Sequence, residues 1–510
     1  MSGGVPGSRA ARGLEKAIVA WVDDNRLSAL ALLKELVRTP SYSGEEGVAS
    51  DRSTMQGKVF AVADSHAGTR VESQRVSANS ENVIEWLPGA GSRALVLDAH
   101  TDIVPEGAPE GWFEANAFSG AEGTIEYLGE ARVRLEVGGH VADAQIRDRM
   151  DRVWRKRSSS TRSIVYGRGS FDNKGAVVAT SLAMGALSEV LTSLGLGLAG
   201  SVIAAYSVDE EAGEGGVRAV VGGLDSWLGR RGYLGGPLGN DGLLLEVAGI
   251  ALDGSYGWMP VVGHRGAVQL ALSTRGRSAH AATPHVGVNA VIEMARLLTA
   301  LSGEESELIR RLTELGDPSL LGLPTTAIGT TIVGGGVRAV SIGQDGIEID
   351  RSGVNAIPDW CEATIDVRFP PSYDLAPVEV ATAITAAVER FLAARFDPDG
   401  WSYSLRQIEG AFTPPVAMAR TLQEAESHPL VRVALRRAEQ VLELSPHLET
   451  APGGTNATRM VHEGRIPTLV EFGPAGALSH DTHEFVEVES VIEGAKILSL
   501  MALDILGIVE

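Results

Sequence analysis

Histidine and acidic residues recur in this chain where apolar runs end. Such residues follow the apolar runs that start at Ala94, at Gly200 and at Gly242. They are His100, Asp102, Glu210, Glu211 and Asp253. Mixed imidazole and carboxylate ligands suit zinc or a similar divalent ion, and a carboxylate beside such an ion can act as a general base. The pattern therefore indicates metal-assisted acid–base chemistry.

A glycine-punctuated stretch, Tyr166–Gly175, supplies a further carboxylate, Asp172. It precedes the apolar helical run Ala176–Leu187, and a turn between a strand and a helix can hold a metal ion. His480 lies in another glycine-rich loop, near the C-terminus. A ligand set of this size, with one carboxylate shared, suits a pair of divalent ions.

Each of these pieces also has an ordinary structural interpretation. His100 could be a core histidine capped by Asp102, and Asp172 could be a solvated turn residue. The run Asp209–Glu211 could be an acidic surface loop, although three consecutive carboxylates repel one another unless a cation or proton lies among them. Recurrence after several apolar strands favours one common metal site.

The elements that must position these residues follow from the apolar patterns. Continuous apolar runs predict buried parallel strands, whose carboxyl ends meet at one edge of a sheet and collect ligands there. The predicted strands are Gly200–Val208, Gly242–Asp253, Pro467–Phe472 and the apolar run that begins the piece Ala94–Pro105. Helical periodicity predicts the helices Leu14–Val37, Met55–Ala63, Ala176–Leu187, His428–Leu442 and Val488–Leu506.

A second module is predicted from about Gly263, where the pattern changes. Its predicted strands are Ala267–Ser273, Thr325–Val333, Ile347–Asp350 and Cys361–Arg368, and its predicted helices are Val288–Leu301 and Pro377–Ala394. Two rounds of strand, helix and strand indicate an α+β domain, 263–412, inserted into an α/β domain made of 1–262 and 413–510. The charged segment at about 112–164 is interpreted as an irregular surface insertion with a short amphipathic helix.

Composition excludes several classes of protein. The chain has 510 residues, too many for one hydrophobic core, and its formal net charge of −21 argues against nucleic acid or an anionic membrane as a partner. Its one cysteine, Cys361, excludes an internal disulfide framework and a thiolate zinc cluster, and lies in a predicted strand. The apolar run Gly175–Gly200 is interrupted by polar residues and predicts a buried helix. No signal peptide is recognisable, so we expect a cytoplasmic protein.

The motifs together resemble the di-zinc amidohydrolase and exopeptidase family that contains acetylornithine deacetylase, succinyl-diaminopimelate desuccinylase, aminoacylase, glutamate carboxypeptidase and bacterial dipeptidases. The resemblance covers most of the chain outside 112–164. The residues that carry it are Leu97–Pro105, Tyr166–Gly175, Asp209–Gly213, Gly276–His280 with Pro284, Gly287, Asn289 and Ala290, Asn355–Pro358, Arg368, and His480 with Glu484. It implies a zinc-exopeptidase-like catalytic domain with a mostly parallel sheet and a ferredoxin-like lid.

The resemblance also implies a role for each site residue. Asp172 would bridge two ions, one completed by His100 and Asp253 and the other by Glu211 and His480. Glu210 would be the general base and Asp102 would orient His100. His280 of the lid would stabilise the oxyanion, and Asn355 and Arg368 would bind a substrate carboxylate. The peptide bond between Asp172 and Asn173 is expected to be cis.

Two assignments need a choice within the family pattern. Glu246 lies on the same predicted strand as Asp253, but Asp253 is twelve residues before the pair Arg265-Gly266 that opens the lid, which is the spacing of the family. An aspartate there is more similar to the dipeptidase members. The second substrate arginine is expected after a Gly-Gly-Thr turn, where this chain has Thr458, so the neighbouring Arg459 takes that assignment.

The resemblance implies metal-dependent hydrolysis of an amide bond next to a free carboxylate. We expect an exopeptidase or dipeptidase that acts on small peptides. An N-acyl-amino-acid deacylase is the alternative, and a non-catalytic binding relative is a remote one. Zinc is the expected ion, with cobalt or manganese as alternatives, and the lid could form a homodimer.

Overall fold

The chain folds into two units. The computed structural model describes residues 9–146, 148–156, 161–239, 241–254, 257–335, 340–343, 346–349 and 355–509. Unit 1 consists of Met1–Val262, Leu422–Glu449 and Thr455–Glu510, and unit 2 consists of Gly263–Thr421 and Thr450–Gly454. Asp350, the last residue of one predicted strand, lies outside the described residues.

The long apolar runs form the middle of a six-stranded sheet in unit 1. Its order is β1 (Arg70–Arg75), β2 (Glu81–Leu87), β9 (Ser201–Ser207), β3 (Ala94–His100), β10 (Val247–Ala251) and β20 (Thr468–Leu469). The pairings of β9, β3, β10 and β20 are parallel, whereas β1 and β2 pair antiparallel, so the sheet is mixed. Every residue of β3 and β9 is buried, as expected for strands covered on both faces.

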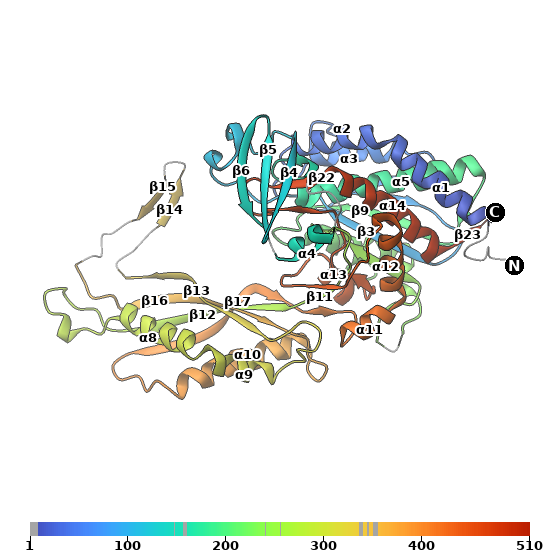
Figure 1. Ribbon diagram of the computed structural model, residues 1–510. Coiled ribbons are helices and arrows are strands. Elements are labelled where there is room, and N and C mark those ends of the chain that lie inside the picture. The colour runs from blue at the N-terminus through green and yellow to red at the C-terminus, as the bar shows by residue number, and fades with distance from the viewer. Residues whose placement is uncertain are drawn as a thin grey trace. The chain divides into compact units, whose positions relative to one another are not determined.

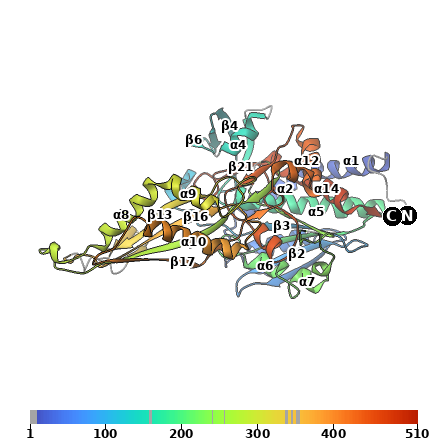
Figure 2. The same cartoon turned by 90° about the horizontal axis from the view of Figure 1, so that it is seen from below.

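Helices cover both faces of this sheet (Figures 1 and 2). The helices α5 (Gly175–Leu194) and α14 (Val488–Leu506) pack on one face, and α6 (Gly215–Val221) and α7 (Trp227–Arg230) lie on the other. The segment Ser170–Leu194 is long and apolar enough to cross a membrane, but 78% of its most apolar window is buried inside the protein. It is therefore the buried helix that the sequence predicts.

The N-terminal helical prediction is wrong in one respect. The single predicted helix Leu14–Val37 is two helices, α1 (Arg9–Asp24) and α2 (Arg26–Val37). The break is at Asn25, whose side-chain amide donates to the carbonyl of Trp21 at 2.9 Å. A short polar side chain that bonds its own backbone competes with helix propagation. Unit 1 also contains the helices α3 (Met55–Ala63), α11 (Leu422–Ser427), α12 (Pro429–Leu442) and α13 (Ala457–His462).

A second sheet in unit 1 corrects the interpretation of 112–164 as irregular. Six antiparallel strands run in the order β21 (Gly476–Ala477), β22 (Phe485–Glu487), β7 (Thr161–Tyr166), β4 (Ala121–Gly129), β5 (Arg132–Val137) and β6 (His140–Gln145). In β5 the buried residues Val133, Leu135 and Val137 alternate with exposed charges. The charges are thus the outer face of a strand. The predicted short helix is α4 (Asp148–Lys156).

Two predicted strands are shorter in the structure. The strand predicted over Gly242–Asp253 is only Val247–Ala251, and the one over Pro467–Phe472 is only Thr468–Leu469. The start of the predicted strand Gly242–Asp253 is instead part of a turn, in which Gly239 N–H donates to the carbonyl of Leu243 at 2.8 Å. Short strands and single-turn helices complete the description: β8 (Gly197–Leu198), β23 (Ile508–Val509), β11 (Val261–His264), β18 (Val416–Ala417), β19 (Glu449–Ala451), Pro109–Gly111, Phe113–Ala115, Ser170–Lys174, Tyr233–Gly235 and Pro284–Val286.

Unit 2 is built on a four-stranded antiparallel sheet. Its order is β13 (Thr325–Gly334), β16 (Trp360–Phe369), β12 (Gly266–Arg275) and β17 (Ser402–Thr413). The helices α8 (Ala290–Gly303), α9 (Glu305–Thr313) and α10 (Pro377–Ala393) pack their apolar sides into one core with the sheet. Cys361 is buried in that core on β16, where the sequence places it. A hairpin, β14 (Val340–Gly343) and β15 (Gly346–Ile349), completes the unit.

Candidate metal centre

The carboxyl ends of three parallel strands bring the predicted residues of unit 1 to one edge of the sheet. His100 ends β3 and pairs in register with Ser207 at the end of β9, so Glu210 and Glu211 begin three residues beyond that pair. Asp253 follows β10 by two residues. Glu246 precedes β10, and its carbonyl accepts from Ala94 N–H at the start of β3. The two candidates for the fourth ligand therefore lie at opposite ends of one strand.

Asp172 reaches the same edge from the turn between β7 and α5. Gly167 has a φ of +139°, and a Cβ there would lie 2.7 Å from a methyl of Val37 and 2.8 Å from the carbonyl of Ala117. This close packing requires glycine. The peptide bond between Asp172 and Asn173 is cis, as expected.

The two oxygens of Asp172 face different histidines. Asp172 Oδ1 lies 3.1 Å from Nε2 of His100, and Oδ2 lies 3.3 Å from Nε2 of His480. Asp253 Oδ1 is 3.7 Å from the same nitrogen of His100, and Glu211 Oε1 is 3.1 Å from the same nitrogen of His480. One carboxylate is therefore shared by two clusters of potential ligands.

Three groups of side chains could each hold an ion, because the ligand atoms of each group lie within 4.8 Å of one another. The groups are His100 with Asp172 and Asp253, Asp172 with Glu211 and His480, and His100 with Glu210 and Glu211. All of these residues belong to unit 1. The structure thus gathers every metal ligand that the sequence predicts.

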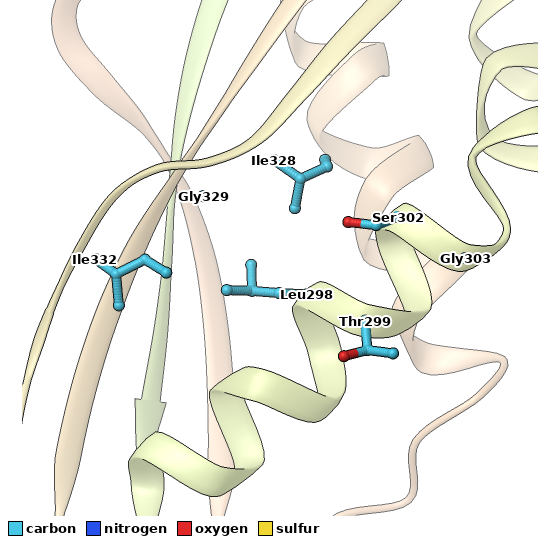
Figure 3. A pocket seen from close by; sticks show the side chains of 7 residues that line it. All are labelled: Leu298, Thr299, Ser302, Gly303, Ile328, Gly329 and Ile332. Atoms are coloured by element: carbon cyan, nitrogen blue, oxygen red, sulfur yellow. The ribbon is translucent and has the colours of Figure 1, made fainter.

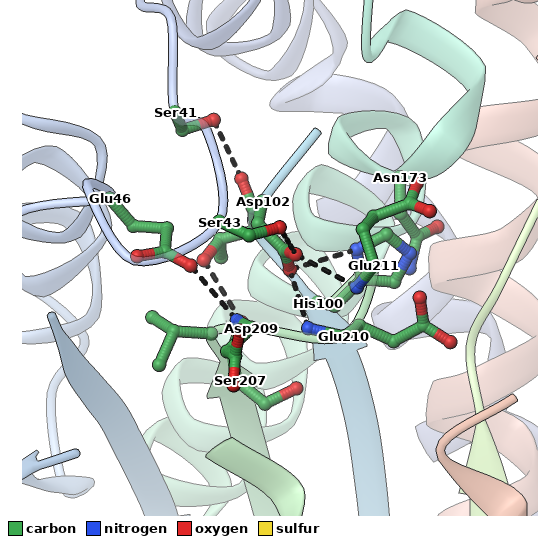
Figure 4. A network of polar contacts seen from close by, with 12 residues as sticks. Ser41, Ser43, Glu46, His100, Asp102, Asn173, Ser207, Asp209, Glu210 and Glu211 are labelled. Atoms are coloured by element: carbon green, nitrogen blue, oxygen red, sulfur yellow. Dashed lines mark hydrogen bonds and ion pairs between the residues drawn. The ribbon is translucent and has the colours of Figure 1, made fainter. Parts of the chain in front are cut away.

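Asp102 fixes the backbone of the neighbouring glutamates (Figure 4). Its Oδ1 accepts from Glu210 N–H at 3.0 Å, and its Oδ2 accepts from Glu211 N–H at 2.9 Å and from the hydroxyl of Ser43 at 2.7 Å. The same carboxylate lies 3.4 Å from Nδ1 of His100. Asp102 therefore positions the acidic loop as well as the imidazole.

The charges at this edge shift one another's protonation. Burial raises the pKa of Glu210 well above its usual value, and burial followed by the charge of Asp172 raises the pKa of Glu211. Hydrogen bonds that His480 donates to Asp172 and then to Glu211 raise the pKa of His480 to about 10. Burial opposes protonation of His100, but Asp102, Asp172 and Asp253 raise its pKa well above the usual value. Carboxylates this close need cations or protons among them.

Glu210 differs from its neighbours in its contacts. Among the residues that the structure describes, no donor is hydrogen-bonded to its carboxylate, which projects away from the Asp102 network in Figure 4. Its backbone, by contrast, is fixed by Asp102. A half-buried carboxylate with a raised pKa and an open acceptor is suited to proton transfer.

The donor set fits divalent metal ions. His100 presents Nε2 to the carboxylates, while its Nδ1 is buried without a hydrogen bond and faces Asp102. This is the arrangement in which a carboxylate orients a metal-binding imidazole from its other nitrogen. Carboxylate and imidazole ligands in two adjoining clusters fit a pair of zinc-like ions.

The predicted residues of unit 2 are partly grouped. Asn355 Nδ2 lies 3.2 Å from Nε2 of His280, and His280 and Ala356 form an isolated bridge between their segments. Arg368 is on β16, and its Nε and Nη2 donate to the two oxygens of Asp366 at 2.6 and 3.2 Å. The structure therefore brings His280 and Asn355 together but pairs Arg368 with a neighbouring aspartate.

Arg459 lies in unit 1 with two acidic partners. Its Nε is 2.5 Å from Glu214 Oε2, and its Nη1 is 2.9 Å from Glu463 Oε1. Thr458, at the position where the family pattern has arginine, is buried. Carboxylates of the protein thus already bind the guanidinium of Arg459.

Several residues that support the site were not identified from the sequence. Glu46 accepts from Asp209 N–H at 2.9 Å, and Asn456 donates to the buried carboxylate of Asp98 at 2.7 Å beneath the strand ends. Glu484, noted only as part of a motif, accepts from four donors around the Asp172 turn. For Glu46, the polar composition of the stretch around Ser43 and Glu46 is a signal that the sequence contains.

Comparison with known proteins identifies the family. Residues 138–504 match Peptidase family M20/M25/M40, which is more than half of the chain. The chain therefore belongs to this peptidase family, as its motifs predicted. It is a hydrolase of a metal-dependent family, and its described residues include the acidic and histidine clusters that such a family requires.

Named relatives extend over nearly the whole chain. The succinyl-diaminopimelate desuccinylase of Cereibacter sphaeroides is 26% identical, covering 91% of this chain and 95% of that protein. The enzyme of the same name from Methylocella silvestris is 27% identical, with coverage of 91% of this chain and 94% of that protein.

Among solved structures, human carnosine dipeptidase 1 is similar with a TM-score of 0.56 and 16% identity, covering 96% of this chain and 99% of that chain. The aminopeptidase PepT of Bacillus cereus has a TM-score of 0.57 and 17% identity, with coverage of 94% and 99%. The structural likenesses show a shared α/β fold.

Proposed function

We propose that this protein is a two-metal hydrolase that cleaves an amide bond next to a free carboxylate in a small substrate. The observation that carries the proposal is Asp172, whose two oxygens face His100 and His480 at 3.1 and 3.3 Å. A carboxylate placed in this way between two ligand clusters suits a pair of ions.

Each ion would have its own ligands besides the shared Asp172. His100 and Asp253 would hold one, and Glu211 and His480 the other. We choose Asp253 over Glu246 because Asp253 is at the carboxyl end of β10. Zinc is proposed from the ligand types, with cobalt or manganese as alternatives. Bound ions of this kind polarise a carbonyl and lower the pKa of water.

Glu210 is proposed as the general base. Its open carboxylate would take a proton from the attacking water and return it to the leaving nitrogen. The raised pKa of Glu210, caused first by burial, favours its taking up that proton. Asp102 would keep Glu210 in place through the backbone hydrogen bond of 3.0 Å.

Residues of unit 2 are proposed to bind the substrate. His280 would stabilise the developing oxyanion, with Asn355 beside it at 3.2 Å. Arg368 would bind the substrate carboxylate with its remaining nitrogen, since Asp366 occupies the other two. We do not extend this role to Arg459, because Glu214 and Glu463 already bind it.

The substrate is proposed to be a small peptide. An aspartate at the position of Asp253 is more similar to the dipeptidase members of the family. An N-acyl-amino-acid deacylase is the second candidate, because the curated relatives at 26 and 27% identity are named succinyl-diaminopimelate desuccinylase.

A substrate screen distinguishes these two candidates. The zinc-reconstituted protein would be assayed with dipeptides and with N-acetyl and N-succinyl amino acids. We expect hydrolysis of dipeptides that end in a free carboxylate. Turnover confined to acyl amino acids would contradict the peptidase assignment and support the deacylase.

Unit 2 is proposed to be a lid and dimerisation domain, close to the predicted range 263–412. Its strand order, β13-β16-β12-β17, with helices packed on one face, supports a ferredoxin-like fold.

The edge strand β13 and helix α8 line a shallow apolar groove of about 460 Å³ (Figure 3). Ile332 in this groove is 57% exposed, which suits an interface with a second copy. Light scattering should give the mass of a dimer, and Ile332→Glu should give a monomer.

A further inference from the structure

Glu484 connects the two loops that supply Asp172 and His480. It lies four residues after His480 and is completely buried. Its Oε1 accepts from the N–H groups of Phe171 and Asp172 at 3.0 and 2.9 Å. Its Oε2 accepts from Gly169 N–H at 2.9 Å and from Arg168 Nη1 at 2.7 Å. A single carboxylate therefore uses both oxygens to hold the Asp172 turn.

The backbone on either side of this contact is already anchored. Phe485 on β22 pairs with Tyr166 on β7, and Gly167 N–H donates to the carbonyl of Glu484 at 2.9 Å. Beyond these paired residues the two segments separate. One continues into the turn that carries Asp172, and the other is preceded by the loop that carries His480. The Glu484 side chain bridges the two segments after they leave the sheet.

We propose that Glu484 is a positioning residue that sets the distance between Asp172 and His480, so that the shared carboxylate can serve both ions. This inference rests on the proposed metal centre. It assigns to Glu484 no contact with substrate or ion. Its effect is transmitted through the Asp172 N–H bond and through the four residues that separate it from His480.

The contacts require a carboxylate rather than an amide. All four partners of Glu484 are donors, so both of its oxygens must accept. Glutamine has nearly the same shape, but its NH2 group would face two donors in either orientation of the amide. A buried donor that loses its acceptor is costly, so the turn would move.

The test is the zinc affinity of Glu484→Gln, measured by competition with a chromophoric chelator. We expect affinity to fall about 10–100-fold, the usual effect of removing a residue that orients a metal ligand. Both ions should be affected, because Asp172 is shared. The matched control is Asp504→Asn, which breaks a partly buried ion pair with Arg437 on α12, away from the site. It should lower the melting temperature and leave zinc affinity unchanged.

Two outcomes would overturn the inference, and a third would overturn the metal centre on which it rests. If folded Glu484→Gln binds two zinc ions as tightly as the natural protein, Glu484 does not position the site. If Glu484→Gln does not fold, the test uses Glu484→Asp, whose side chain is one methylene shorter but keeps both acceptor oxygens. Unchanged zinc affinity in Glu484→Asp would count against the inference. If the natural protein binds no zinc, the proposed metal centre itself fails, which is a separate result.

Discussion

At the scale of single residues, the proposed role of Glu210 as general base gives the most direct chemical prediction. Glu210→Gln keeps the shape of the side chain and removes its ability to take a proton. We predict a fall in the rate of hydrolysis of about 10²–10⁴-fold, while the protein still binds two zinc ions. Steady-state kinetics and zinc analysis on the same sample provide the measurement. A Glu210→Gln protein that retains the full zinc-dependent rate would contradict the assignment.

Asp253 and Glu246 provide a paired prediction. Asp253 lies in a cluster with His100 and Asp172, whereas Glu246 precedes the same strand. Asp253→Asn should weaken binding of one ion, because an amide oxygen is a poorer ligand than a carboxylate for zinc. Glu246→Gln should leave zinc binding and hydrolysis as they are. Calorimetric titration of both variants with zinc provides the measurement. Weakened zinc binding in Glu246→Gln and normal binding in Asp253→Asn would contradict the choice of Asp253.

The sequence predicted the charged residues of the site better than their supports. His100 and Glu211 follow apolar runs and Asp172 precedes one, so their residue types and places are both visible in the sequence. The partners of Asp102 and Glu484 are mostly backbone N–H groups, which every residue other than proline carries. No residue type marks such a donor, and the network became apparent only from the fold.

At the scale of elements, a partly buried ion pair joins the C-terminal helix α14 to α12. Asp504 accepts from Arg437 at 2.5 and 2.7 Å, and Arg436 donates to it at 2.6 Å. Burial raises the pKa of Asp504, but the hydrogen bonds from Arg437 and then Arg436 outweigh it, so that the pKa lies below its usual value.

Asp504→Asn should therefore destabilise the protein in a way that depends on pH. Because the folded pKa is lower than the unfolded value of about 3.9, the carboxylate contributes stability above that value and loses it as the pH falls through the folded pKa. We predict a loss of about 2–3 kcal/mol near neutral pH, measured by urea unfolding. The difference from the natural protein should shrink below about pH 4. A constant difference would show that the ionised carboxylate is not responsible.

Elements were predicted well where one apolar pattern is long and poorly where charges interrupt it. The helix Val488–Leu506 matches α14 to the residue, and Met55–Ala63 matches α3. The strands in 112–164 were missed because their outer faces carry many charges, although Val133, Leu135 and Val137 alternate as a half-buried strand requires. Counting period-two positions in that segment would have revealed β5.

At the scale of the whole molecule, bound ions should raise the stability of the fold. Ions that bind the folded chain and not the unfolded one stabilise it by about 2.7 kcal/mol at a free concentration of one hundred times Kd. The carboxylates at the strand ends repel one another without a cation, which adds to the effect. We predict that chelator treatment lowers the melting temperature and that added zinc restores it. Calorimetry that gave the same melting temperature with and without zinc would contradict this prediction.

The sequence predicts a second domain from the change of pattern at about Gly263. The structure separates unit 2 at Gly263 and returns to unit 1 at Leu422, with Thr450–Gly454 assigned to unit 2. The short excursion at Thr450–Gly454 has no apolar pattern of its own. Such a segment can be assigned only by what it contacts.

The central claim is that Asp172 is shared by two metal ions, and its most direct test is the number of zinc ions bound per chain. Elemental analysis after dialysis at a fixed free zinc concentration should give two ions for the natural protein. Asp172→Ala should lose both together, because the two groups proposed to hold the ions, His100 with Asp253 and Glu211 with His480, share Asp172. Two tightly bound ions in Asp172→Ala, or none in the natural protein, would contradict the account.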